Sequence, residues 1–373
     1  MDGAKNSTRC LTLLSQLLLG LDASIELPNS EDSRNRCMEE ITRTVASFTP
    51  QDFGELWALA ASHHVILRAF PALHEVMVAQ GIERAEAVER VMTKERARIE
   101  NALSFLSPIC QALKQVGDVI VIKSLDHWPD LGSDLDLYSN AESMDVVAIM
   151  RERFKARLED RSWGDRLANK WNFMVPGLPE LVEVHVGRLG QTGEQVAVAN
   201  SLVKRSRTAD FGTQTLRVPA AEEQLIISTL QRMYRHFYMR MCDIVDTARL
   251  VESCSIDYGY LKSLSRSAGL WDGLATYLVM VSGYAASYRG GVELPLPALV
   301  TDGARFGSEH ISFRREFLRI PIFPQAAKLY ATEWTRLLLN GDLQSTLRLS
   351  LLPGLAAAAA LEFKLTGTDK GIW

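Results

Sequence analysis

The chain lacks most of the features that mark specialised classes of protein. Its 373 residues include only five cysteines, an odd number, and no two of them are spaced C-x-x-C. This scarcity argues against a disulfide framework and against a cysteine-ligated zinc site. Charge of one sign is not in large excess either, because the formal net charge is only −4. Such a balance does not call for a nucleic-acid partner or an acidic membrane.

Long apolar runs are also missing. Residues 351–361 contain Pro353 and Gly354 and fall far short of the roughly 20 residues that a membrane-spanning helix needs. Residues 11–21 resemble the apolar part of a signal peptide, but Asp2 interrupts the basic leader and no clear cleavage site follows. We therefore predict a protein without a membrane span, located in the cytoplasm.

The beginning of the chain has the pattern of successive helices. Apolar residues recur at steps of three and four through residues 51–70 and 83–113, which is typical of amphipathic helices. Pro50 suits the first turn of one of these helices, and Pro71 is expected to end it. The sequence thus predicts a helical region over residues 1–113.

The periodicity then changes to that of strands. Residues 119–122 are all β-branched, which indicates a buried strand, and residues 133–138 alternate between polar and apolar. A helix is expected over residues 140–158. Residues 171–175 and 181–186 flank a Pro/Gly turn and predict a β-hairpin.

Helical periodicity returns at residue 222, and one apolar stripe predicts a single helix over residues 222–252. Its other side carries Arg232, Arg235, His236, Arg240 and Asp243. Two interpretations stay open. The basic stripe faces a cleft and neutralises phosphates, or it is a solvated face with pairs such as Arg240–Asp243.

These segments predict an α+β fold. A small mixed β-sheet core is expected over residues 114–220, between the N-terminal helical region at 1–113 and a C-terminal helical domain at 221–373.

The residues that suggest chemistry are acids on two of the predicted strands. Alternation puts the carboxylates of Asp134 and Asp136 on one face, with Leu135 pointing into the core. Adjacent carboxylates repel one another, and a divalent cation relieves the repulsion. Glu183 is a lone acid in an apolar strand, on the same face as His185. A third carboxylate of this kind would complete a two-metal site for attack at phosphorus.

Several of these features have simpler explanations. An Asp-x-Asp pair is common on solvated strand edges, so by itself it is a weak sign. His185 could contact substrate or metal, or it could be a core histidine bonded to backbone. Trp128 and Trp171 could stack a base, although burial is the usual fate of such side chains.

Taken in order, the motifs resemble the nucleotidyltransferase superfamily that includes DNA polymerase β, and more specifically its branch of uncharacterised nucleotidyltransferases. The matching segments are Ile122-Lys123-Ser124, Trp128-Pro129, Ser133-Asp134-Leu135-Asp136-Leu137 and Val182-Glu183-Val184-His185. The resemblance covers residues 50–255. The chain departs from the pattern at the turn, where Ser124 replaces the Gly of this branch and Lys123 replaces the first Gly of the wider superfamily.

The resemblance implies a magnesium-dependent nucleotidyltransferase. Such an enzyme moves a nucleoside monophosphate from an NTP, ATP among them, to an acceptor hydroxyl and releases pyrophosphate. The implied ligands of two Mg²⁺ ions are Asp134, Asp136 and Glu183, and the implied nucleotide contacts are Lys123, Ser124, Ser133, Arg235 and Arg240.

The acceptor and even the activity stay open at this stage. A small molecule is favoured as acceptor, a protein side chain is a further option, and the acidic net charge argues against a polynucleotide. The altered Lys-Ser turn supports a second hypothesis, a catalytically inactive nucleotide-binding or interaction protein on the same fold. A phosphohydrolase is disfavoured, because the sequence has no His-Asp doublet to supply imidazole ligands.

Overall fold

A computed structural model describes residues 2–21, 30–253 and 255–366. Helix makes up 62% of it and strand 11%, so the fold is a mixed α+β fold with one small mixed sheet, as predicted. Within the described residues, every helix is too short or too polar to cross a lipid bilayer. Four cysteines are free thiols there, and the fifth, Cys254, lies outside the described residues.

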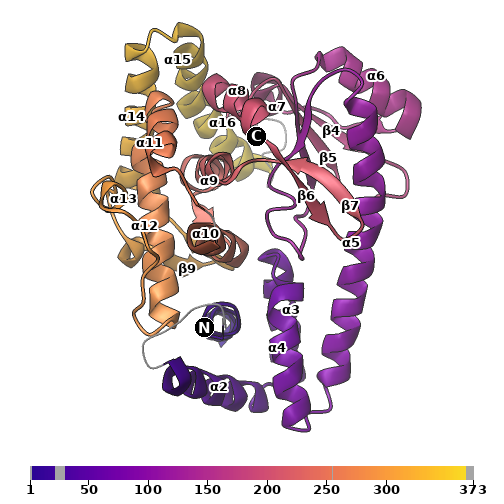
Figure 1. The fold of residues 1–373 in the computed structure, drawn as a ribbon, viewed down its shortest axis with the longest axis vertical. Helices are drawn as coiled ribbons and strands as arrows, with labels where there is room; N and C mark the ends of the chain where they lie inside the picture. Colours follow the sequence, from indigo (N-terminus) through magenta and orange to yellow (C-terminus); the bar gives the residue numbers. More distant parts are fainter. Residues whose placement is uncertain (1, 22–29, 254, 367–373) are drawn as a thin grey trace.

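The N-terminal region is helical. Its elements are α1 (Asp2–Ser15), the π-helical turn η1 (Gln16–Gly20), α2 (Ser30–Ala46), α3 (Pro50–Ser62), α4 (Ile66–Ala79) and α5 (Ala85–Leu113). The long helix predicted over residues 83–113 is confirmed as α5, which runs along one side of the molecule (Figure 1).

The single helix predicted over residues 51–70 is wrong. Pro50 does begin α3, whose N-terminus is capped by Thr49, but α3 ends at Ser62 and Pro71 lies inside the next helix. The break has a tertiary cause that periodicity cannot show. The buried ring of His63 accepts the amide N–H of Met241 at 2.8 Å and bonds the carbonyl of Glu316 at 2.6 Å.

A five-stranded sheet follows, in the order β1-β2-β5-β4-β3. Its strands are β1 (Val119–Val121), β2 (Leu135–Ser139), β3 (Arg157–Leu158), β4 (Lys170–Met174) and β5 (Val182–Val186). Strands β2 and β5 are parallel and the other pairs are antiparallel. The two predicted strands and the predicted hairpin, β4–β5, are confirmed, but β2 begins at Leu135, so Ser133 and Asp134 lie in the loop before it rather than on the strand.

Helices and a separate hairpin surround this sheet. They are α6 (Ser143–Phe154), α7 (Trp163–Ala168), α8 (Val196–Arg205), β6 (Arg207–Phe211) and β7 (Gln214–Val218). Helix α6 is shorter than predicted, because Lys155 adopts a left-handed φ of 52° and residues 157–158 join the sheet as β3.

The single helix predicted over residues 222–252 is also wrong. The chain forms α9 (Ala221–Thr229), the π-helical segment η2 (Leu230–His236), the short strand β8 (Tyr238–Met239) and α10 (Met241–Ser253). Phe237 breaks the helix with a φ of 53°. Strand β8 then pairs with a strand some 80 residues further along the chain, which explains why local periodicity misses the break.

The remaining elements form the C-terminal region. They are α11 (Tyr258–Ser267), α12 (Trp271–Tyr288), α13 (Ala298–Thr301), η3 (Ser308–His310), β9 (Ser312–Arg314), β10 (Phe317–Arg319), η4 (Ile322–Ala326), α14 (Ala327–Leu339), α15 (Leu343–Ser350) and α16 (Leu352–Thr366). Strands β8, β10 and β9 make a second, three-stranded sheet.

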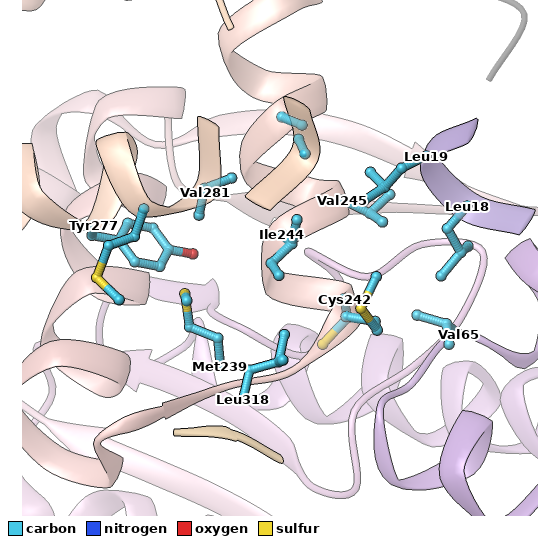
Figure 2. Packing of buried hydrophobic residues seen from close by; sticks show 14 of the residues in the cluster. Leu18, Leu19, Val65, Met239, Cys242, Ile244, Val245, Tyr277, Val281 and Leu318 are labelled. Carbon is cyan, nitrogen blue, oxygen red and sulfur yellow. The ribbon is translucent and has the colours of Figure 1, made fainter. Parts of the chain in front are cut away.

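The buried apolar side chains form two clusters. One joins the five-stranded sheet to the C-terminal half of α5 and to the β6–β7 hairpin. The other joins the N-terminal helices to α9, α10 and α12. In Figure 2, Ile244 and Val245 of α10 lie between Leu19 of η1 on one side and Tyr277 and Val281 of α12 on the other. The domain boundaries expected at residues 113 and 220 stay a prediction.

Candidate functional site

The side chains predicted to form a site all line one cavity of about 170 Å³. The β1–β2 loop contributes Lys123, Ser124, Ser133 and Asp134, and strands β2 and β5 contribute Asp136 and Glu183. Arg235 comes from η2, and Arg240 lies between β8 and α10. The cavity therefore has a wall of acids on the sheet and a wall of cations on the helical side.

The register of the sheet brings two of the acids together. Asp136 on β2 lies directly beside Glu183 on the parallel strand β5. Leu135 is fully buried on the opposite face of β2, as strand alternation predicts. Ligand atoms of Asp136, Glu183 and His185 all lie within 4.8 Å of one another. This is the convergence on which a shared metal site depends.

Asp134 lines the same cavity but does not belong to that tight group. Burial first, and then the nearby carboxylates of Asp136 and Glu183, raise the pKa of its carboxyl to about 6. Its ionised form is thus disfavoured by the environment, which a cation would correct.

A lysine ammonium lies between the two adjacent acids. Lys123 contacts Asp136, and its Nζ is 3.5 Å from Oε1 of Glu183. Burial would lower the pKa of Lys123, but the attraction of Asp136 and Glu183 outweighs burial and raises it. Lys123 also has a left-handed φ of 61°, a conformation that glycine adopts with least cost.

A second lysine, which sequence reasoning missed, completes the charge balance. Nζ of Lys170 on β4 is 2.9 Å from Oε2 of Glu183 and 2.9 Å from Oδ1 of Asp165. Burial alone would raise the pKa of Glu183, but Lys123 and Lys170 hold it well below its usual range. The available signal was a lysine directly before the strand predicted over residues 171–175, which pairs with the strand of Glu183.

His185 faces the acids. Its Nε2 is 2.7 Å from Oε1 of Glu183 and 3.4 Å from Nζ of Lys123. Its Nδ1 is buried and has no hydrogen-bond partner among the described residues. The alternative of a core histidine bonded to backbone is therefore not what the structure shows.

Ser124 serves the backbone rather than the cavity. Its hydroxyl donates to the carbonyl of Asp134 at 2.8 Å and accepts the amide N–H of Asp136 at 2.7 Å. Its own amide donates to the carbonyl of Ile122 at 2.6 Å. A phosphate contact from Ser124 would require one of these bonds to break. Ser133 is exposed, with its Oγ 3.5 Å from Oδ2 of Asp134.

The basic residues of the opposite wall differ in their partners. Arg232 is buried and its Nε is 2.8 Å from Oδ1 of Asp243. Arg235 is half-buried and makes no hydrogen bond or ion pair among the described residues. Arg240 donates to Nε2 of His64 at 2.8 Å and lies over the ring of Tyr238. The Arg240–Asp243 side-chain pair of the solvated-face interpretation does not form, and the Arg240 backbone N–H donates to the Asp243 carboxylate instead.

A buried polar network holds the β1–β2 loop in place. Nδ1 of His127 is 2.5 Å from Oδ2 of Asp246 on α10, and Arg68 on α4 pairs with both Asp246 and Asp130. The loop that carries Lys123 and Ser124 is thus tied to two helices from opposite ends of the sequence.

Comparison of the chain with protein-family models, with curated proteins and with solved structures gives no match. The fold and the cavity define the chain as an α+β protein with adjacent acids on parallel strands and cations opposite them.

Proposed function

We propose that the chain is a metal-dependent nucleotidyltransferase. The observation that carries the proposal is the pairing of Asp136 with Glu183 on parallel strands. The opposite wall of their cavity holds the guanidinium of Arg235, which has no partner in the part of the chain that the structure describes. The acids suit cations, and the arginine suits an anionic ligand. A nucleoside triphosphate with its metal ions has both kinds of charge.

The donor set fits magnesium. Mg²⁺ takes oxygen ligands, commonly one or two carboxylates together with substrate phosphates, and here the carboxylates are those of Asp136 and Glu183. The disfavoured carboxylate of Asp134 supplies a further oxygen at the edge of the group. When bound, such ions neutralise the phosphates and align them for in-line displacement.

The residues of the chain would act by positioning and by charge. Asp134, Asp136 and Glu183 hold the cations, while Lys123, Arg235 and Arg240 face the phosphates across the cavity. The oxygen of an acceptor hydroxyl would then attack the α-phosphorus and lose its proton to solvent. The bond between the α-phosphorus and the oxygen that bridges the α- and β-phosphates would break, and pyrophosphate would leave.

A second candidate is a nucleotide-binding protein without catalytic activity. One observation favours it, because both carboxylate oxygens of Glu183 already contact lysine or histidine nitrogens. In that case the acids would be permanent partners of Lys123 and Lys170, and nucleotide would bind through the cations alone.

The test uses labelled NTPs, Mg²⁺ and a panel of acceptors, with pyrophosphate release measured in parallel. We expect Asp136→Asn to lower transfer by at least about 100-fold, since it removes charge aimed at the transition state. Glu152→Gln, an exposed acid on α6, is the matched control and keeps full activity. Unchanged transfer in Asp136→Asn contradicts the proposal. Nucleotide binding without any pyrophosphate release in the wild type supports the inactive alternative.

A further inference from the structure

We infer that Lys123 is a built-in countercation that competes with the metal and moves to the phosphates when nucleotide binds. The inference rests on the proposed function and adds a mode of regulation to it. Metal binding without nucleotide is then weak, and nucleotide makes it tight.

Both carboxylate oxygens of Glu183 already have nitrogen partners. Its Oε1 contacts His185 Nε2 at 2.7 Å and Lys123 Nζ at 3.5 Å, and its Oε2 contacts Lys170 Nζ at 2.9 Å. Asp136 contacts Lys123 as well. A divalent cation can bridge the two acids only if one of these nitrogens gives up its place.

Of the three side chains that contact Glu183, Lys123 is the one that can move away from the acids. His185 is held within strand β5, and Lys170 has a second carboxylate partner, Asp165. Lys123 instead lies on the loop after β1 and lines both the main cavity and an adjoining recess. Arg235 lines the same two spaces, so the ammonium can move toward the cationic wall only when phosphates lie between them.

The backbone of Lys123 is in the left-handed region, which is unusual for a lysine. A lysine with a φ of 61° is held in a sparsely populated backbone region, and such residues concentrate at functional sites. The amide of Ser124 closes a tight turn onto Ile122 at this point. Glycine would avoid the cost of this conformation, so the lysine is explained by what its ammonium does beside Asp136 and Glu183.

These facts predict positive coupling between metal and nucleotide. Phosphates offer Lys123 new partners, and its departure exposes two adjacent carboxylates to a cation. By linkage, each ligand then raises the affinity for the other by the same factor. Removal of the ammonium removes the competition and, with it, the coupling.

The experiment measures Mn²⁺ binding by electron paramagnetic resonance, with and without a non-hydrolysable ATP analogue. We expect Lys123→Met to bind Mn²⁺ at least about tenfold more tightly than the wild type without nucleotide. In the wild type the analogue raises Mn²⁺ affinity by at least about tenfold, and in the variant by no more than about twofold.

Two further variants protect the test from misfolding and from indirect effects. Lys123→Gly also removes the ammonium but suits the positive φ, so it should bind Mn²⁺ as tightly as Lys123→Met. Lys170→Met removes the other ammonium on Glu183 but keeps Lys123, so it retains the nucleotide coupling. Equal Mn²⁺ affinity in the wild type and both Lys123 variants overturns the inference, as does loss of coupling in Lys170→Met.

Failure of this inference is distinguishable from failure of the proposed function. Tight Mn²⁺ binding by the wild type without nucleotide overturns the countercation role while the enzyme proposal stands. Absence of Mn²⁺ binding in every variant, even with the analogue, overturns both. Mn²⁺ that stays bound to the double variant Lys123→Met, Asp136→Asn also overturns the inference, since the ion would then lie elsewhere.

Discussion

The two walls of the cavity are built in different ways. The sheet wall places Asp136 and Glu183 through strand alternation and register, and these acids are in contact with lysines from the same wall. The helical wall comes from a helix that breaks at Phe237. It holds Arg232, which is ion-paired with Asp243, and Arg235, which has no hydrogen-bond or ion-pair partner among the described residues. From this difference we infer that the sheet wall binds cations and the helical wall binds an anion.

The largest expected effect is on the stability of the fold, and it distinguishes Arg232 from Arg235. Arg232→Met leaves the buried carboxylate of Asp243 without its cation, and loss of one partner of a buried pair costs about 3–5 kcal/mol. Urea denaturation checks this in the free energy of unfolding. A loss below about 1 kcal/mol would show that Arg232 is not the structural member of the helical wall.

A medium effect concerns the acids of the sheet wall and depends on pH. The pKa of Asp134 is raised to about 6 in the folded protein, above its value of about 3.9 when unfolded. The folded state therefore binds this proton more tightly, so stability is highest below about pH 4 for this group and falls as pH rises through about 6.

Asp134→Asn removes the free-energy cost of ionising this carboxyl in the folded protein. In buffer with a chelator, we expect the variant to be about 2 kcal/mol more stable than the wild type at pH 7.5, with the difference shrinking toward pH 4. The measurement is the free energy of unfolding of the variant and of the wild type at pH 7.5 and at pH 4. A constant difference across this range would mean that Asp134 is not the titrating group.

The smallest effect concerns the unpaired arginine. Arg235→Met should change stability by less than about 0.5 kcal/mol, because no described partner is left behind. It should weaken binding of an ATP analogue, in the presence of Mn²⁺, by about tenfold in calorimetry. Arg207→Met, at an exposed position on β6, is the control with unchanged affinity. Equal affinity of Arg235→Met and Arg207→Met for the analogue would show that the helical wall does not bind the anionic phosphates.

Local sequence patterns predicted the elements of the sheet wall better than those of the helical wall. Alternation in residues 133–138 places Asp136 and Leu135 on opposite faces whatever lies around them. The apolar stripe from residue 222 is compatible with one long helix, and only the pairing of β8 with β10 interrupts it. A helix boundary set by a distant strand leaves no trace in the local period.

What the sequence by itself determined is the small mixed sheet, the parity of its acids and the residue types around them. Tertiary structure decided that Asp136 lies beside Glu183, that Lys123 and Lys170 neutralise them, and that Arg235 rather than Arg232 is unpaired. Parity is a property of one strand and follows from backbone geometry alone. Register, ion pairing and helix breaks depend on groups far apart in the chain, so they exist only once the fold has formed.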